Sequence, residues 1–230
     1  MSSLPRHAPT GSDRRRRLPG LRAVAVVATL VVVLVVATAT AGLGAAPSAK
    51  SPTIATTPYA MPTKVALADT PPPWPLPENA QPYIAAAGLS VLTAEQLQVH
   101  YHVHLDIIDN GSKVTVPAGI GFVIKNGRAT GITVLHTHNT SGVLHIESAA
   151  DKAYTLGQAF TEWGVALSAT QVGGLQADSG HVLATYVNGK QFSGDPATIR
   201  LKKHLEIAIW YGPTGTTPKV PKSYRFPAGL

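Results

Sequence analysis

Apolar and polar residues alternate along much of the chain beyond residue 98. Residues 99–107 read V-H-Y-H-V-H-L-D-I, and this repeat of two predicts a β-strand with one apolar face and one polar face. The Asn-Gly pair at 110–111 suits the two-residue turn of a hairpin, so the chain is expected to return as a strand over residues 113–116. In that register Ile107 lies opposite Val114, which makes one side of the hairpin apolar.

The same order of strand, Asn-Gly turn and strand recurs near the C-terminus. Residues 181–187 and 190–192 flank Asn-Gly at 188–189 and are expected to form a second hairpin. Residues 199–201 and 205–211 have alternating apolar side chains and are expected to form further strands. These segments supply the strands of a sheet.

Helical signals are confined to two short segments. Thr155 and Gln158 have the spacing of a capping box, the apolar residues that follow share one helical face, and Gly164 marks the end. A shorter helix is expected over residues 81–87. Together these elements predict a mainly β domain, an antiparallel sandwich or barrel with one or two packed helices.

The first 46 residues have a different character. Residues 1–22 contain six arginines and one acid, and residues 23–46 form an apolar run rich in Val, Ala and Leu without a charged residue. A run of this length can cross the hydrocarbon core of a membrane, which takes about 20 residues. The pattern is typical of a transmembrane anchor or of a cleavable signal peptide, and in both cases the arginines stay on the cytoplasmic side. We therefore expect a single-pass membrane protein with its C-terminal domain outside, or a secreted protein if the signal is cleaved.

Composition divides the rest of the chain into a linker and a domain. Residues 47–77 are rich in Pro, Thr and Ala, a composition that favours a semi-extended tether. Residues 78–230 carry the strand patterns and are expected to form one extracytoplasmic β-rich domain.

Charge and cysteine content exclude several functions. Without its first 22 residues the chain keeps 13 basic and 11 acidic residues, so the excess of positive charge belongs to the leader. A domain this close to neutrality is a poor partner for nucleic acid. The absence of cysteine rules out disulfides, thiolate metal sites and thiol catalysis.

Histidines are concentrated in two segments of the expected sheet. Because side chains alternate across a strand, His100, His102, His104 and Asp106 share one face of the first strand. The opposite face carries the apolar residues of the same repeat. Three imidazoles therefore stand in a row with no apolar residue between them.

The second histidine segment, residues 134–147, predicts another hairpin. In its register His136 lies opposite His145, and His138 and Glu147 lie on the same face. Directly opposed residues have Cβ atoms about 4.5–5.5 Å apart, which lets two imidazoles bind one ion.

Six clustered imidazoles favour a transition-metal site, because His is the commonest metal ligand. A structural or pH-sensing cluster is the alternative, since His titrates near about pH 6.5. The chain has no cysteine, and its two methionines stand outside the expected domain, so soft ligands for Cu(I) are missing. Cu(II) or Zn(II) is therefore the leading cofactor, with Ni(II) and iron as alternatives.

For the carboxylates and the two remaining histidines of the domain, the sequence allows more than one role. Asp106 and Glu147 are expected to bind the ion or to orient a histidine through its second nitrogen. His181 and His204 are isolated in sequence, and His204 is expected in a surface turn, from which it could fold back onto the cluster.

Five longer strings stand out within residues 95–228. They are H-x-H-x-H-L-D-I, V-P-A-G-I-G, H-T-H-N-x-S-G-x-L-H-I-E-S, L-G-Q-x-F-x-x-W-G and N-G-K-x-x-x-G-D-P. As a set they resemble a family of exported or membrane-anchored, histidine-rich bacterial proteins. The resemblance implies export and brings no activity with it.

The leading interpretation is an extracytoplasmic protein that binds copper or zinc and sequesters, buffers or delivers it. The chain has more imidazoles than a catalytic zinc site needs, since such a site uses three protein ligands and keeps one position for water. The less favoured alternative is a metal-dependent enzyme, either a copper or iron oxidoreductase or a zinc hydrolase, although no H-E-x-x-H, nucleophile elbow or phosphate loop is present. A third alternative is an anchored interaction domain that responds to pH or metal. The sequence identifies the membrane and a metal ion as partners, but no protein.

Overall fold

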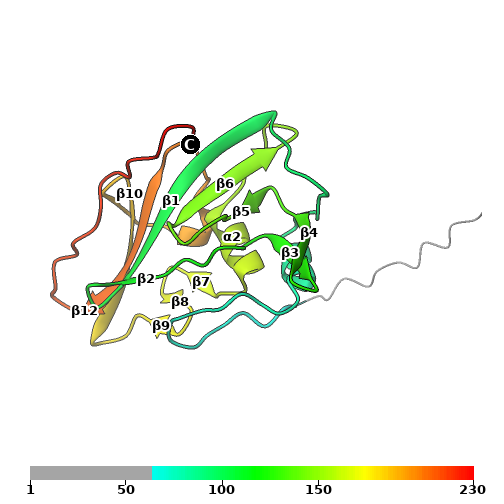
Figure 1. Ribbon diagram of the computed structural model, residues 1–230. Coiled ribbons are helices and arrows are strands. Elements are labelled where there is room, and N and C mark those ends of the chain that lie inside the picture. The colour runs from blue at the N-terminus through cyan, green and yellow to red at the C-terminus, as the bar shows by residue number, and fades with distance from the viewer. Residues whose placement is uncertain (1–63) are drawn as a thin grey trace, which may run out of the picture. The chain divides into compact units, whose positions relative to one another are not determined.

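The computed structural model describes residues 64–230, in which a large β-sheet is the main feature (Figure 1). The expected basic leader (1–22) and the expected membrane or signal segment (23–46) lie outside the described residues. Within the described residues, no helix has both the length and the hydrophobicity to cross a membrane. The seven strands of the sheet run in the order β11 (Lys190–Phe192), β10 (His181–Val187), β12 (Glu206–Pro213), β1 (Val99–Asp109), β6 (Val143–Ser148) and β5 (Leu135–His136), with β2 (Ser112–Val114) paired to β1.

Smaller elements surround this sheet. A hairpin and a three-stranded sheet pack beside it, together with two α-helices and one 3-10 turn. They are β3 (Phe122–Lys125) and β4 (Arg128–Ile132), then β7 (Leu167–Ser168), β8 (Gln171–Val172) and β9 (Leu175–Gln176), and finally α1 (Gln81–Ala86), α2 (Leu156–Trp163) and η1 (Pro196–Thr198).

The expectation of a mainly β domain with two helices is confirmed, but two details of it are wrong. In the part of the chain that the structure describes, the large sheet does not close into a barrel, because β11 and β5 stand at its two ends. The sheet is also mixed, since β1 and β12 are parallel, with Leu105 beside Ile207. Alternation of apolar and polar residues shows which face of a strand is buried, but it does not reveal the direction of a distant neighbour.

Both hairpins expected from Asn-Gly turns form. Ile107 pairs with Val114 as expected, and the turn residues Asn110 and Gly111 have φ values of 49° and 85°. These left-handed values suit Asn-Gly, because two-residue hairpin turns of this type need positive φ at both positions. The strand expected over 205–211 is β12, whereas the strand expected over 199–201 is reduced to one isolated bridge at Arg200.

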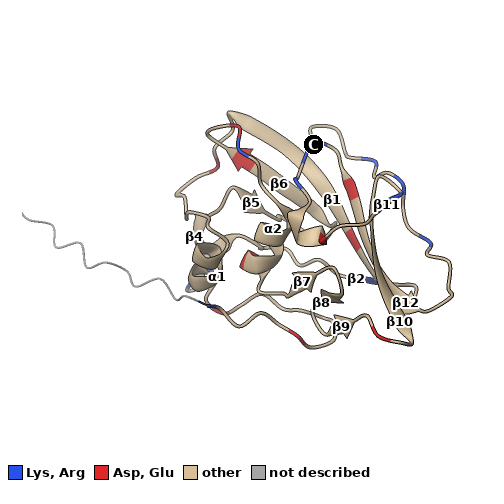
Figure 2. Ribbon diagram, turned by 180° about the vertical axis from the view of Figure 1, so that it is seen from behind, with Lys and Arg blue, Asp and Glu red and all other residues tan. Residues whose placement is uncertain are grey.

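Helix α2 forms where its capping box predicts. The side chain of Thr155 accepts a hydrogen bond from the backbone of Gln158, the Gln158 side chain accepts one from the backbone of Thr155, and Gly164 ends the helix with φ 80°. The helix lies against the sheet (Figure 2), and its buried apolar residues belong to the same core cluster as those of β1 and β6. The other face of β1, β6 and β5 is therefore left for the histidines.

The folded part of the chain begins before residue 78. Trp74 is 2% exposed and meets Trp163 edge-on, with ring centroids 5.8 Å apart. The backbone N–H of Ala68 donates to the carbonyl of Gly164. Residues 64–77, which composition assigns to the linker, therefore pack against the domain, because one buried aromatic side chain can hold a Pro-rich segment in place.

Candidate metal centre

Strand pairing brings three imidazoles into one row. His102 on β1 pairs with His145 on β6, and His145 pairs with His136 on β5. The His136–His145 pair confirms the expected register of the hairpin at residues 134–147, whereas the His102–His145 pair joins segments that the sequence could not align. Since neighbouring strands are about 4.8 Å apart, β6 places its polar side chains within reach of both flanking strands.

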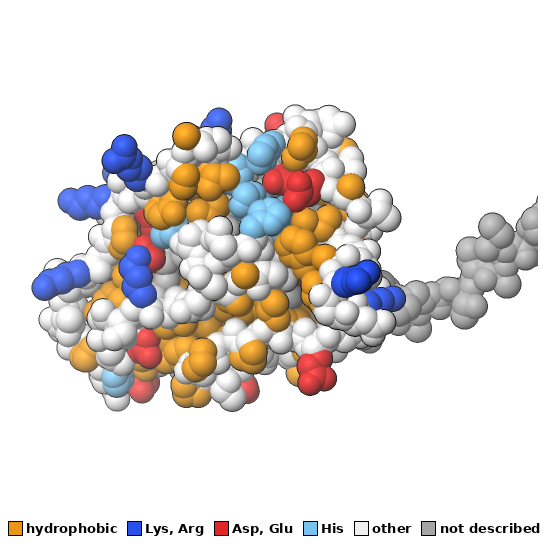
Figure 3. Space-filling view, in the orientation of Figure 1, with side chains coloured by type: hydrophobic (Ala, Val, Ile, Leu, Met, Phe, Trp, Pro, Cys, Tyr) orange, Lys and Arg blue, Asp and Glu red, His pale blue; other side chains and the backbone are white. Residues whose placement is uncertain are grey.

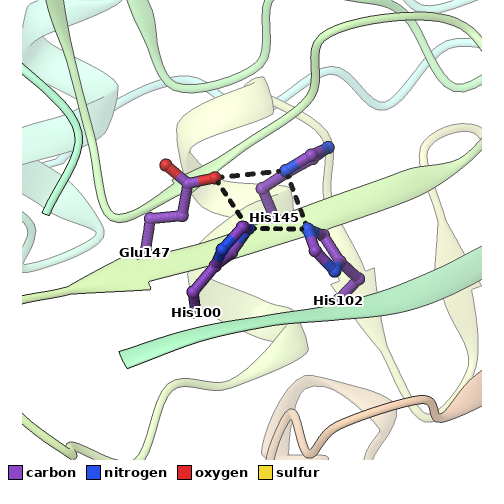
Figure 4. Close-up of side chains that lie close together, drawn as sticks. All are labelled: His100, His102, His145 and Glu147. Carbon is purple, nitrogen blue, oxygen red and sulfur yellow. Dashed lines mark hydrogen bonds and ion pairs between the residues drawn. The ribbon is translucent and has the colours of Figure 1, made fainter. Parts of the chain in front are cut away.

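His100, His102, His145 and Glu147 point toward one another from β1 and β6 and form the β1–β6 group (Figure 4). The Nε2 atoms of His100 and His102 are 3.0 Å apart, and His102 Nε2 is 3.1 Å from His145 Nδ1. The Glu147 Oε1 atom closes the ring, at 3.3 Å from both His145 Nδ1 and His100 Nε2.

These spacings match the coordination shell of one transition-metal ion. Ligand atoms about 2.0–2.1 Å from a tetrahedral ion lie about 3.3 Å from one another, and neighbours in a square plane lie about 2.9 Å apart. The four edges of the β1–β6 group measure between 3.0 and 3.3 Å. The group can therefore hold a four-coordinate ion with three nitrogen ligands and one oxygen ligand.

His136, His138, His145 and Glu147 form a second group, the β5–β6 group, which shares its β6 residues with the first. The Nε2 atoms of His136 and His138 are 3.1 Å apart, and His136 Nε2 is 3.8 Å from Glu147 Oε2. The Nε2 atom of His138 is also 3.4 Å from Oε1 of Glu95. Because Glu95 lies on the segment before β1, which carries no strand pattern, no sequence signal identified it.

The backbone fixes the tautomer of His136. Its Nδ1 lies 2.9 Å from the carbonyl oxygen of Thr133 and must donate there, because a carbonyl only accepts. Nε2 of the neutral ring then carries its lone pair toward His138 and Glu147. A backbone partner that orients a histidine in this way is typical of metal ligands.

Burial keeps the inner imidazoles uncharged. Burial, with a smaller contribution from the neighbouring histidines, lowers the pKa of His102 and of His136 to about 4 and that of His145 to about 3. These three rings therefore offer lone pairs at neutral pH without first losing a proton. Burial raises the pKa of Glu147 to about 7, with a smaller contribution from the charge of Glu95.

The centre is buried inside and open at its outer edge. His102, His136 and Glu147 are at most 3% exposed, whereas the side chains of His100 and His138 are 37% and 39% exposed. Figure 3 shows histidine side chains gathered at one surface beside acidic side chains. An ion can thus enter through the two outer histidines and be held by the inner ones.

The structure separates His104 and Asp106 from the other site residues expected from the sequence. The Nδ1 atom of His104 is 2.8 Å from Oε2 of Glu206, and its Nε2 is 2.9 Å from the carbonyl oxygen of Ser141. Asp106 forms an ion pair with Lys113 at 2.8 Å. His104, Asp106 and Glu206 also lie close enough for an ion, and they form the β1–β12 group.

Both ring nitrogens of His104 have protein partners, so this histidine is better placed to pair with a buried carboxylate than to bind metal. Tyr224 stacks on its ring, with centroids 3.7 Å apart, and shields the pair. Glu206 faces His104 only because β1 and β12 are parallel, so local sequence could not have predicted the pair. Burial raises the pKa of Glu206, and the neighbouring His104 opposes that shift.

The two isolated histidines stay outside these groups. His204 lies in a turn, as expected, with φ 60° and its ring stacked on Phe226. His181 stacks on Tyr211 and lies 3.5 Å from the carboxylate of Asp178. Neither belongs to a group of described residues that could hold an ion.

Comparison with protein-family models, with curated proteins and with solved structures found no match to the chain. The function is therefore inferred from the geometry of the histidine groups.

Proposed function

We propose that the domain binds Cu(II) or Zn(II) through the β1–β6 group and stores or passes on the ion outside the cytoplasm. The observation that carries the proposal is the closed ring of four ligand atoms, spaced 3.0–3.3 Å apart along its edges. Nitrogen and carboxylate ligands suit both ions. The apolar run at residues 23–46 supports a location outside the cytoplasm.

The number of ligands favours storage or delivery over catalysis. Catalytic zinc sites have three protein ligands and leave one position for water, whereas the β1–β6 group supplies four. The half-exposed His100 gives a route for exchange, because a solvated imidazole can leave the ion while the inner ligands still hold it. Such an arrangement suits loading from, or transfer to, another carrier.

The test measures bound metal in the full chain, produced without a polyhistidine tag. The protein is loaded with Cu(II) or Zn(II), dialysed exhaustively and examined by elemental analysis, with the unfolding temperature recorded before and after loading. We expect retained metal and a rise in unfolding temperature, because a ligand at 100 times its Kd stabilises the folded state by about 2.7 kcal/mol.

His100→Ala and His181→Ala form a matched pair of variants. The two side chains are 37% and 38% exposed and both stand on strands of the large sheet, so their effects on folding should be similar. We expect the His100 variant to bind metal more weakly and the His181 variant to bind like the parent chain. Equal loss in both variants, or no retained metal in the parent, would refute the proposal.

A further inference from the structure

We infer that the histidine cluster holds two metal ions, one in the β1–β6 group and one in the β5–β6 group, with Glu147 as the ligand that bridges them. The inference rests on the proposed function, because it adds a second ion beside the first.

The order of the strands creates two adjacent positions. β6 lies between β1 and β5, so Glu147 and His145 face His100 and His102 on one side and His136 on the other. The row His102–His145–His136 crosses all three strands. The centres of two neighbouring positions in such a row lie about one strand spacing apart, about 4.8 Å. This separation is within about 1 Å of the roughly 3.5–4 Å between the ions of two-metal sites.

The donors are too numerous for one four-coordinate ion. Five side chains converge from three strands and His138 joins them from the turn after β5. These six fall into two groups of four that share Glu147 and His145. Ligand atoms bound to one ion can be at most about 4.2 Å apart, twice the metal–nitrogen distance. A second ion accounts for His136 and His138, which lie across β6 from the first position.

Glu147 carries the strongest sign of a second ion. Its Oε1 is 3.3 Å from His100 Nε2 and from His145 Nδ1, so this oxygen belongs to the first position. Its Oε2 is buried, has no hydrogen-bond partner, and lies 3.8 Å from His136 Nε2. A buried carboxylate oxygen without a partner is costly, and an ion between Oε2 and His136 would satisfy it. The 3.8 Å spacing is within the about 4.2 Å that two ligands of one ion can span.

His145 and Glu95 complete the surroundings of the second position. The Nδ1 of His145 faces the first group, and its other nitrogen points away from that group (Figure 4). The His145 ring meets His138 edge-on, with centroids 4.5 Å apart. Glu95, which is 3.4 Å from His138 Nε2, places a further carboxylate at the exposed side of the second position.

The experiment titrates the full chain with Cu(II) and compares copper content with the electron paramagnetic resonance (EPR) signal. We expect about two equivalents of copper, with an integrated signal well below the copper content and a half-field transition, because two ions that share a carboxylate are magnetically coupled. His100→Ala and His138→Ala, both at half-exposed positions, should each weaken binding at one position and leave about one tightly bound copper ion, whose uncoupled signal accounts for it. His181→Ala should keep the coupled pair.

Each other outcome has a definite meaning. One equivalent in the parent chain, lost in the His100 variant and kept in the His138 variant, would overturn the second ion and leave the proposed function standing. Two equivalents of copper whose EPR signal accounts for all of the copper, with no half-field transition, would overturn the bridge through Glu147. No bound copper or zinc would overturn both proposals.

Discussion

Glu162 on α2 is a buried carboxyl group behind the metal centre. It is 1% exposed, and burial raises its pKa well above the ordinary 4.5. Its Oε2 lies 2.9 Å from the hydroxyl oxygen of Thr133, which also bonds to the carbonyl of Leu135. A hydroxyl has one proton, so both contacts are satisfied when a protonated Glu162 donates to Thr133 and Thr133 donates to Leu135. We therefore expect Glu162 to be uncharged in the folded protein at pH 7.

The protonation of Glu162 makes the free energy of unfolding depend on pH. The unfolded chain ionises near the ordinary pKa of 4.5, and each unit of pH above that value favours the unfolded state by about 1.4 kcal/mol. The folded pKa is raised, so the stability contributed by this group is complete below pH 4.5 and is lost as the pH rises toward the folded value. Ionisation in the unfolded chain therefore lowers the free energy of unfolding by about 1 kcal/mol at pH 5 and by about 3 kcal/mol at pH 7.

Glu162→Gln removes this dependence and keeps the shape of the side chain. The amide introduces a constant offset of about 1–3 kcal/mol, since one of its N–H groups has no acceptor. The offset does not change with pH. The free energy of unfolding of the variant, minus that of the parent chain, should therefore increase by about 2.5 kcal/mol between pH 5 and pH 7.

The assay is urea unfolding of the full chain at both pH values, with a chelator present and tryptophan fluorescence as the signal. All three tryptophans of the chain are buried in the described domain, so fluorescence reports the folding of that domain alone. Glu78→Gln, at an exposed position, serves as the control and should show no such change. A difference between variant and parent that stays constant with pH would refute a protonated Glu162. The backbone carbonyl of Thr133 accepts the hydrogen bond that orients His136. The result therefore also tests the residue that positions this proposed metal ligand.

Three further predictions concern the packing of the domain. His104→Ala should leave the amount of bound metal unchanged. It should lower the free energy of unfolding by about 3–5 kcal/mol, because it leaves the buried Glu206 without its partner. Loss of metal would show that the β1–β12 group binds an ion. Trp74→Ala should lower the same free energy by about 3–5 kcal/mol in urea unfolding, and a change below about 1 kcal/mol would mean that residues 64–77 do not pack on the domain. Gly121→Ala and Gly127→Ala both place a side chain at positive φ (78° and 71°), which costs about 1–2 kcal/mol. Of these two positions, only Gly121 would bring the new Cβ into a clash, with the Leu135 carbonyl and with the Thr133 hydroxyl at 2.6 Å. Gly121→Ala should therefore have the lower unfolding temperature. Equal unfolding temperatures in the two variants would contradict this packing.

Local sequence determined the elements whose signals are short in range. The Asn-Gly turns at 110–111 and 188–189 fixed two hairpins, because left-handed φ values are needed within two adjacent residues. The capping box of Thr155 and Gln158 fixed the start of α2 by hydrogen bonds across three residues. The alternation along 99–107 gave the two faces of β1, and the hairpin register gave the His136–His145 pair.

Only the tertiary structure decided which histidines work together. β1 pairs with β6 and with β12, which are distant in sequence, and these pairings place His102 beside His145 but His104 beside Glu206. One run of alternating histidines is thereby divided between two groups. The structure also brought Trp74 from a Pro-rich segment into the core. A period of two defines the face on which a side chain stands, whereas its neighbours across the sheet are set by long-range strand pairing, which depends on how the whole apolar face is buried.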